Sequence, residues 1–354
     1  MKQQENRSKA AMDRIQKIFK KHGTKALETA RRAILEKELQ SQKAQQALTY
    51  FMTEYWHDTA RPSLMALTCK AVGGNPERTQ PIAIPMILIS GAIDIHDDII
   101  DQSETKDGRP TVYGKYGKDI ALLVGDALLF KGLIMLNEAS AKSIQAEEMS
   151  RIREIIKNMF FELGDAEALE LEFRGRLDVS PRKYLRVVRM KAADVEAHTR
   201  ISAILGNASN KEIKALSEYG RLLGMMIILR DDLIDLMVPE ECQSRIRAEA
   251  LPLPLLYGLK NPIHGHKIKS ILQSQKIGNK QAKDIMKILQ DSQAIAQYDE
   301  LIKGIAAEAM SKLKPLSYKT RELQLLIQAM LSAESEGART KCGSISTNQI
   351  EPVS

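Results

Sequence analysis

Residues 90–101 read Ser-Gly-Ala-Ile-Asp-Ile-His-Asp-Asp-Ile-Ile-Asp, and the final Asp-Asp-Ile-Ile-Asp recurs as Asp-Asp-Leu-Ile-Asp at residues 231–235. Each copy closes a segment in which apolar residues recur at helical spacing. The first and last Asp of a copy are four residues apart, so they lie on one face of a helix. Because like charges at that spacing repel, we expect a cation to neutralise each cluster.

Outside these two clusters, apolar residues recur at helical spacing along most of the chain. Examples are Leu64, Leu67 and Ala71, and Leu122, Leu123 and Leu129. The 354 residues include 20 Gly, 12 Pro and only 5% aromatic residues, and alternating polar and apolar runs long enough for strands are missing. We therefore expect an all-α fold, a bundle of packed helices.

The formal net charge of +7 lies in the N-terminal segment, because residues 1–43 hold 12 Lys and Arg against 5 Asp and Glu. These basic residues alternate with Gln, Ala and Glu on an expected helix instead of gathering where a phosphate backbone could run. We therefore expect no nucleic-acid partner and interpret the segment as a solvated helix face. A weak attraction to an anionic membrane is the alternative.

No long Pro-, Gly- or Ser-rich linker divides the sequence into independent halves. We expect a basic N-terminal helix in residues 1–43, one helical domain in residues 44–336 and a disordered tail in residues 337–354. No stretch is long and apolar enough for a membrane span, and no signal peptide opens the chain. The three cysteines lie far apart without disulfide or metal spacing, so we expect a cytoplasmic protein.

The paired aspartate clusters indicate a site for Mg²⁺, which prefers oxygen ligands and shares its coordination shell with substrate phosphates. Two facing clusters with several Mg²⁺ ions would clamp a diphosphate, and an apolar helical cavity suits a hydrocarbon tail. Metal ions and basic side chains would draw charge onto the leaving diphosphate, while the apolar wall shelters the carbocation. The pattern predicts an enzyme that ionises an allylic prenyl diphosphate, and exposed helix ends with capping aspartates are the alternative.

On these motifs the sequence resembles the trans-isoprenyl diphosphate synthase (polyprenyl synthetase) family over roughly residues 40–330. Besides the clusters, the resemblance rests on Gly108-Arg109-Pro110-Thr111, on Gly125-Asp126-Ala127-Leu128-Leu129, and on Tyr184-Leu185 followed by Lys191. It implies an isoprenoid synthase type bundle of about a dozen helices around a central apolar cavity. It also implies a homodimer that binds three Mg²⁺ ions.

The resemblance further implies roles for individual residues. The metal ligands would be Asp97, Asp101, Asp231 and Asp235, supported by Asp98 and Asp232. The residues that bind a substrate diphosphate would be Lys106, Lys191, Arg61 and Arg230. Ala92 and Ile93 would set the length of the prenyl chain, and the small Ala92 favours a long tail.

The sequence departs from the family pattern where the second substrate, isopentenyl diphosphate, would bind. Asp58 stands at the position of a diphosphate-binding Lys in a Gly-Gly-Lys-Arg-x-Arg-Pro motif. Asp107 replaces the second Arg of an Arg-Arg-Gly motif, and Ile228 replaces a Gln. An anion that faces an anionic substrate repels it, so we expect poor use of isopentenyl diphosphate. In the alternative interpretation both aspartates are exposed and without a role, and Arg61 could bind a diphosphate or pair with Asp58.

Three hypotheses follow from this pattern. The first is an Mg²⁺-dependent prenyltransferase that passes the prenyl cation to an acceptor. The second is a terpene synthase of the same fold, in which the cation cyclises or loses a proton, so that no second diphosphate site is needed. The third is a non-catalytic subunit of a heteromeric synthase, against which the intact aspartate clusters argue.

Overall fold

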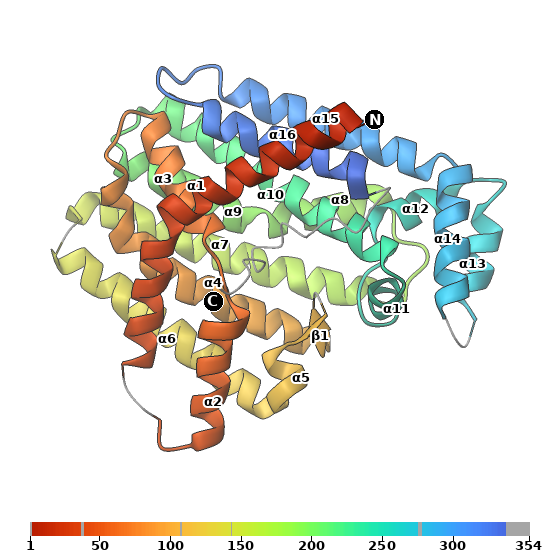
Figure 1. The fold of residues 1–354 in the computed structure, drawn as a ribbon, viewed down its shortest axis with the longest axis horizontal. Helices are drawn as coiled ribbons and strands as arrows, with labels where there is room; N and C mark the ends of the chain where they lie inside the picture. Colours follow the sequence, from red (N-terminus) through yellow and green to blue (C-terminus); the bar gives the residue numbers. More distant parts are fainter. Residues whose placement is uncertain (1, 37–38, 107, 143, 275–277, 338–354) are drawn as a thin grey trace.

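Helices form nearly all of the secondary structure in the computed structural model, which describes residues 2–36, 39–106, 108–142, 144–274 and 278–337 (Figure 1). The α-helices are α1 (Lys2–Leu35), α2 (Gln42–Tyr50), α3 (Ala60–Ala71), α4 (Gln80–Ile100), α5 (Val112–Tyr116), α6 (Lys118–Lys142), α7 (Ala146–Phe173), α8 (Pro181–Lys191), α9 (Ala193–Leu205), α10 (Asn210–Met237), α11 (Pro239–Ala248), α12 (Leu253–Lys260), α13 (Gly265–Leu272), α14 (Asn279–Asp291), α15 (Ala294–Lys312) and α16 (Arg321–Gly337). The shorter elements are the π-helix η1 (Phe51–Tyr55), the 3₁₀-helix η2 (Pro76–Thr79) and the antiparallel strands β1 (Thr105–Lys106) and β2 (Arg109–Pro110). The predicted all-α fold is confirmed.

The pair α4 and α6 makes the most extensive helix contact in the described bundle. Gly132 of α6 faces α4, where a Cβ atom would lie 2.7 Å from Cγ1 of Ile89 and 3.0 Å from the carbonyl oxygen of Pro85. Only glycine allows the two backbones to approach this closely. The tight contact holds α4 against α6 around Pro85 and Ile89, and the first aspartate cluster lies at the C-terminal end of α4.

The helix α10 carries the second cluster in its last turns and packs against α9 and α15. Its N-terminus has a capping box, in which the backbone N–H of Ser209 donates to Glu212 at 2.8 Å and the N–H of Glu212 donates back to the Ser209 hydroxyl at 3.3 Å. This cap defines where the helix begins. The second cluster lies near the other end of this 28-residue helix.

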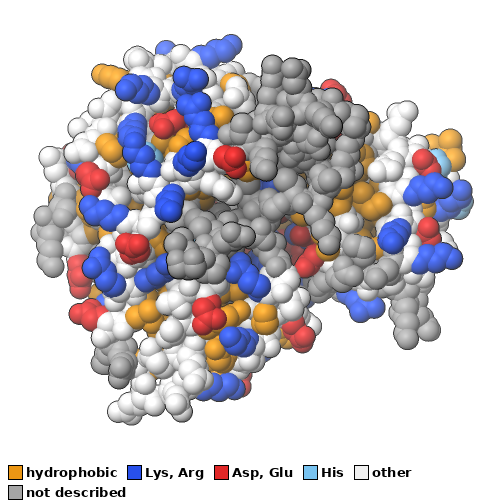
Figure 2. All heavy atoms as spheres, in the orientation of Figure 1, with side chains coloured by type: hydrophobic (Ala, Val, Ile, Leu, Met, Phe, Trp, Pro, Cys, Tyr) orange, Lys and Arg blue, Asp and Glu red, His pale blue; other side chains and the backbone are white. Residues whose placement is uncertain are grey.

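The segment predicted as a basic N-terminal helix, residues 1–43, contains α1 (Lys2–Leu35) and the first residues of α2, and α1 packs on the bundle. Ile15, Ile18 and Leu27 are buried on its inner face, and α1 contacts α3, α4 and α16. Figure 1 shows α1 crossing the bundle beside α16, so the two ends of the described chain lie together. On the face seen in Figure 2, Lys and Arg side chains are interspersed with acidic and hydrophobic ones.

Two further expectations concern the ends of the chain and the membrane. The predicted disordered tail, residues 337–354, lies outside the described residues except for Gly337, where α16 ends. Among the described helices, none reaches the length and hydropathy that a membrane span requires.

Candidate functional site

The ends of α4 and α10 converge on one acidic space. Glu249, which follows α11, lies within electrostatic reach of both clusters, because burial and the negative charges of Asp97 and Asp235 raise its pKa. Burial together with Asp97 and Glu249 also raises the pKa of Asp101 to about 8. The structure thus brings together two clusters that are more than a hundred residues apart in the sequence.

In the first cluster, the second and third aspartates are paired with basic side chains of the chain itself. The ammonium group of Lys106 lies 3.4 Å from Oδ1 of Asp94 and 3.7 Å from Oδ1 of Asp98. Arg174, at the end of α7, donates from Nη2 to Oδ1 of Asp101 at 3.2 Å. Lys106, expected to bind a diphosphate, therefore contacts carboxylates in this structure.

In the second cluster, Arg245 of α11 lies between two of the aspartates. Its Nη1 donates to Oδ1 of Asp232, and its Nε donates to Oδ2 of Asp235 at 2.8 Å. The hydroxyl of Tyr184 donates to the other oxygen of Asp232. Asp232 is 1% exposed, so both of its carboxylate oxygens are used inside the protein.

The first aspartate of each cluster differs from the others. The side-chain carboxylates of Asp97 and Asp231 form no hydrogen bond or ion pair with any described residue. Burial and the neighbouring carboxylates of Asp235 and Asp232 raise the pKa of Asp231 to about 7. The charges of Arg230 and Arg245 act in the opposite direction and lower this pKa, but burial outweighs them. These two carboxylates are available for a ligand.

Two further basic residues expected at the diphosphate, Lys191 and Arg230, lie beside this space. The ammonium group of Lys191, the last residue of α8, contacts Glu167 at 3.0 Å and also contacts Glu170. Arg230 is 3% exposed, and its Nε and Nη1 atoms have no hydrogen-bond partner among the described residues. A buried guanidinium without partners is costly, so Arg230 can accept an anionic group without first giving up a hydrogen bond from these atoms.

Contributors to this space that were not predicted from the sequence include Asp94, Glu167, Glu170, Arg174 and Glu249. Glu167 and Glu170 are three residues apart on α7 and therefore share a helix face. That spacing was the available signal, but exposed helices carry similar Glu pairs on solvated faces, so it is not specific.

Carboxylates outnumber basic side chains two to one around this space. The carboxylates are Asp94, Asp97, Asp98, Asp101, Glu167, Glu170, Asp231, Asp232, Asp235 and Glu249, and the basic residues are Lys106, Arg174, Lys191, Arg230 and Arg245. The described residues contain no ready-made group of three or more metal ligands. The donor type and the excess negative charge nevertheless fit Mg²⁺ at the unpaired Asp97 and Asp231.

Asp58 and Arg61 have surroundings that correct one sequence-based interpretation. Asp58 is fully buried, and its Oδ1 accepts hydrogen bonds from the backbone N–H groups of Ala60 and Arg61 at 3.1 and 3.0 Å. The guanidinium of Arg61 contacts Oδ2 of Asp58 at 3.1 Å and Oδ2 of Asp194 at 2.8 Å. Asp58 is therefore neither an exposed residue nor an anion facing a substrate, because its carboxylate accepts from the first N–H groups of α3 and pairs with Arg61. Of the two roles left open for Arg61, the structure shows the ion pair.

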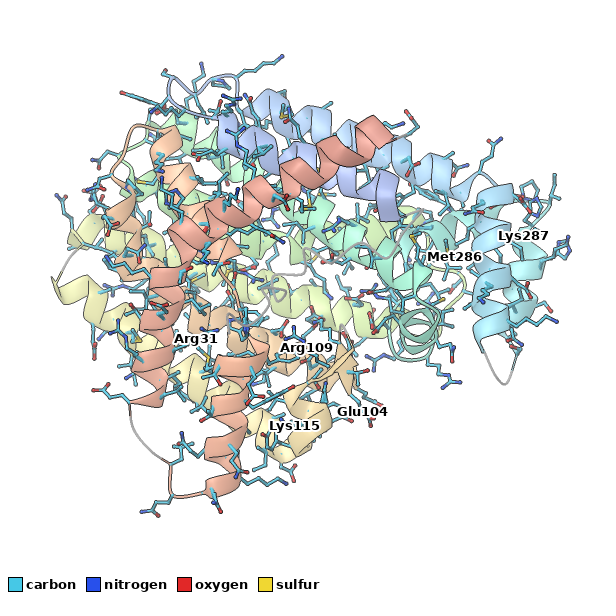
Figure 3. All side chains as sticks on the ribbon, in the orientation of Figure 1. Arg31, Glu104, Arg109, Lys115, Met286 and Lys287 are labelled. Carbon is cyan, nitrogen blue, oxygen red and sulfur yellow. The ribbon has the colours of Figure 1, made fainter. Side chains whose placement is uncertain are left out.

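Other basic side chains near this segment hold backbone carbonyls. Arg31 of α1 donates to the carbonyl of Trp56 at 3.1 Å, and Arg109 donates to the carbonyl of Glu54 at 3.2 Å. Figure 3 labels both arginine side chains. These contacts order the chain between η1 and α3. Asp107, the second altered position, lies outside the described residues, and Ile228 is partly buried at the edge of the core.

The two residues expected to set the chain length face different parts of the protein. Ala92 is fully buried in a cluster that includes Phe51 and Trp56, whereas Ile93 is partly buried against the main core. Ile93 is four residues before Asp97, so the two share a face of α4. Of the two side chains, Ile93 therefore lies on the side of the acidic space.

A cavity of about 600 Å³ opens between the segment after α7 and the helices α12 and α13. Its lining includes Leu177, Leu259 and Leu272 together with His266 and Lys269, and contains none of the six clustered aspartates. This cavity therefore lies outside the candidate site. A central apolar cavity at the clusters stays a prediction.

Two curated relatives show what the sequence is similar to. Geranylgeranyl diphosphate synthase of Methanosarcina mazei is 32% identical over 192 residues, which cover 54% of this chain and 58% of the relative. Short chain isoprenyl diphosphate synthase of Methanothermobacter thermautotrophicus is 35% identical over 182 residues, which cover 51% of this chain and 55% of the relative. The matches therefore span little more than half the length of these relatives.

The fold and the family comparison cover more of the chain. Geranylgeranyl pyrophosphate synthetase from Pyrococcus horikoshii superposes with a TM-score of 0.76 at 24% identity, covering 92% of this chain and 99% of that chain, which shows a shared fold. The family described as Polyprenyl synthetase matches residues 42–290, a segment that contains both aspartate clusters. The chain therefore belongs to the polyprenyl synthetase family.

Proposed function

We propose that this protein is an Mg²⁺-dependent prenyltransferase that ionises an allylic prenyl diphosphate and passes the prenyl cation to an acceptor. The observation that carries the proposal is the pair Asp97 and Asp231. Each is the first aspartate of its cluster, both border one acidic space, and neither is paired with another described residue. The names of the relatives, which are prenyl diphosphate synthases, support the same substrate class.

The chain's own residues have separable roles in this reaction. Asp97 and Asp231 would hold Mg²⁺, which supplies positive charge to the leaving diphosphate when it is bound. Arg230, whose Nε and Nη1 atoms have no hydrogen-bond partner among the described residues, binds the diphosphate oxygens and stabilises the product anion as the allylic C–O bond breaks. Lys191 contacts Glu167 and Glu170, and it would have to exchange one of these contacts to bind the diphosphate as well. The apolar residues Ile93 and Ile227 precede the clusters on α4 and α10, and they keep water from the cation.

The contacts of Asp58 and Arg61 indicate whether isopentenyl diphosphate can be the acceptor. The family's Lys is absent at that position, and Arg61 is held by two carboxylates, so this segment offers no cation to a second diphosphate. We therefore propose that isopentenyl diphosphate is a poor acceptor. The reason differs from the repulsion expected from the sequence, because the negative charge of Asp58 is neutralised by Arg61.

A terpene synthase activity is the second candidate. The ion pairs of Arg61 with Asp58 and Asp194 favour it. A cation that cyclises or loses a proton needs no second diphosphate site. The engaged Arg61 is therefore compatible with a reaction that has no co-substrate. A non-catalytic subunit is disfavoured, because it would not need the unpaired carboxylates of Asp97 and Asp231.

One incubation tests these proposals. The purified chain is supplied with Mg²⁺ and allylic diphosphates from C10 to C25, with and without isopentenyl diphosphate, and the products are analysed for hydrocarbons and for longer diphosphates. We expect diphosphate release from at least one allylic substrate that stops when the metal is chelated. Hydrocarbons formed without isopentenyl diphosphate would support the terpene synthase, and no consumption of any substrate would contradict both candidates.

A further inference from the structure

Arg245 contacts three carboxylates at the second cluster. Its Nε lies 2.8 Å from Oδ2 of Asp235 and 3.4 Å from Oε2 of Glu249, while its Nη1 donates to Asp232. The side chain of Arg245 is 17% exposed, so these contacts are largely shielded from water. The Tyr184 hydroxyl donates to the oxygen of Asp232 that Arg245 does not use.

A guanidinium at this place acts as a permanent positive charge. Arginine does not lose its proton in proteins, and its planar fork can bridge two carboxylates. A divalent cation that used the same oxygens would have to displace it, leaving a buried guanidinium without its partners. The oxygens of Asp232 and Asp235 are thus less accessible to metal than those of Asp231, which has no partner among the described residues.

On the basis of the proposed function, we infer that Arg245 is the resident cation of the second aspartate cluster. Asp232 and Asp235 bind Arg245, and a divalent metal ion binds at this cluster through Asp231 without them. Arg245 consequently lowers the metal affinity of the cluster and stabilises the metal-free protein. It is a positioning residue, because it acts through the two aspartates.

The test compares the full-length wild type with Arg245→Gln and with the matched control Arg247→Gln, which removes an exposed arginine from the same helix. Mn²⁺ binding is measured by electron paramagnetic resonance and by calorimetry, and the Tm is measured with and without Mn²⁺. We expect Arg245→Gln to bind Mn²⁺ at least 10-fold more tightly, to have a lower Tm without metal, and to show a larger rise in Tm with Mn²⁺. Arg247→Gln should match the wild type in all three. Unchanged Mn²⁺ affinity in folded Arg245→Gln would overturn the inference.

A second variant keeps the test decisive if Arg245→Gln does not fold. Asp235→Asn retains the shape of the side chain but removes its charge. If Asp235 binds Arg245 and not the metal ion, the Mn²⁺ affinity of Asp235→Asn stays within about twofold of that of the wild type. A loss of 10-fold or more would show that Asp235 is a metal ligand and that Arg245 does not occupy the cluster.

These readouts are independent of turnover. Failure of the wild type to consume any allylic diphosphate would refute the proposed function and leave the Mn²⁺ titrations unchanged. Normal consumption with unchanged Mn²⁺ affinity in Arg245→Gln would refute only the role of Arg245.

Discussion

The aspartates within one cluster have identical side chains but different surroundings. Asp97 and Asp231 are unpaired among the described residues, whereas Asp101 and Asp235 each contact an arginine from another helix. An arginine at the last aspartate of each cluster reduces the repulsion across the four-residue spacing. The carboxylates of the first aspartates form no such ion pair, so a bound cation can contact them without displacing an arginine.

Replacing either unpaired aspartate tests the catalytic role. We expect Asp97→Ala and Asp231→Ala to lower turnover by on the order of 100-fold or more, because each removes charge that holds the metal at the leaving group. The free energy of unfolding should not fall, because neither side chain has a partner to lose. Steady-state kinetics and urea unfolding measure the two effects, with Asp284→Ala on the exposed face of α14 as the control. Near-normal turnover would favour the non-catalytic subunit.

Asp58→Lys is expected to destabilise the protein instead of restoring an acceptor site. The change removes the buried carboxylate that accepts from the first N–H groups of α3, and it places a second cation beside the partly buried Arg61. Breaking a buried ion pair costs about 3–5 kcal/mol, measurable by urea unfolding. The matched exposed change Asp284→Lys should cost little. A stable Asp58→Lys variant with improved affinity for isopentenyl diphosphate would contradict this prediction.

At the scale of single elements, the neighbouring residues Ala92 and Ile93 of α4 lie on different faces of the helix. Ala92 points into a closed aromatic cluster in which the rings of Phe51 and Trp56 stack with centroids 5.4 Å apart. Ile93 lies on the face of Asp97. A substitution at one position therefore tests packing, and a substitution at the other tests the substrate space.

We expect Ala92→Phe to lower the free energy of unfolding by about 1–3 kcal/mol, because the closed cluster has no room for a ring. Ile93→Phe should fold normally and shorten the preferred prenyl chain by at least one C5 unit. Urea unfolding and chain-length analysis of the products measure the two outcomes. If Ala92→Phe is stable and shortens the product, the floor of the substrate space lies at Ala92, as the sequence alone indicates.

At the scale of the whole molecule, the outer face of α6 is an apolar surface. Leu123, Phe130 and Ile134 are 61%, 64% and 54% exposed, although the opposite face of α6 packs on α4. A helix that is apolar on all sides is normally buried on all sides. We therefore propose that a second copy of the chain covers this surface, which would form the expected homodimer.

The double variant Leu123→Asp with Phe130→Asp should convert the dimer into a monomer, because each carboxylate would be buried at the interface. Light scattering coupled to size-exclusion chromatography measures the mass in solution. Ile263→Asp, at a 68% exposed residue outside α6, is the control and should leave the mass unchanged. A wild type that is already monomeric would refute this interface.

The acidic space also predicts how stability depends on pH. The pKa values of Asp101 and Asp231, raised by burial to about 8 and about 7, lie far above those of the unfolded chain. Between pH ~4 and ~8 the native state therefore binds more protons than the unfolded state, and the stability of the metal-free protein falls as pH rises. We expect a lower Tm at pH 8 than at pH 5 without metal, and a smaller difference with Mg²⁺. Without metal, the Tm of the variant Asp101→Asn should fall less steeply with pH than that of the wild type. An unchanged dependence of Tm on pH would contradict the raised pKa of Asp101.

Features of the site that depend only on residues close together in the sequence were predictable from the sequence. Hydrophobic periodicity indicated an all-α bundle, and the four-residue spacing placed the outer aspartates of each cluster on one helix face. These are local properties, since the backbone repeat of a helix determines which side chains share a face. The family resemblance followed from the same short motifs, and the polyprenyl synthetase match over residues 42–290 confirms it.

The ion-pair partners of the charged residues in and near the site were decided only by the tertiary structure. Arg174 reaches Asp101 across 73 positions of sequence, and Arg61 reaches Asp194 across 133. The sequence pattern suggested that Asp58 faces a substrate, but packing buried it against Arg61. Local spacing cannot predict such pairs, because they depend on how helices far apart in the chain cross. The sequence by itself thus determined where the carboxylates lie along their helices, and the fold determined which of them are left for a ligand.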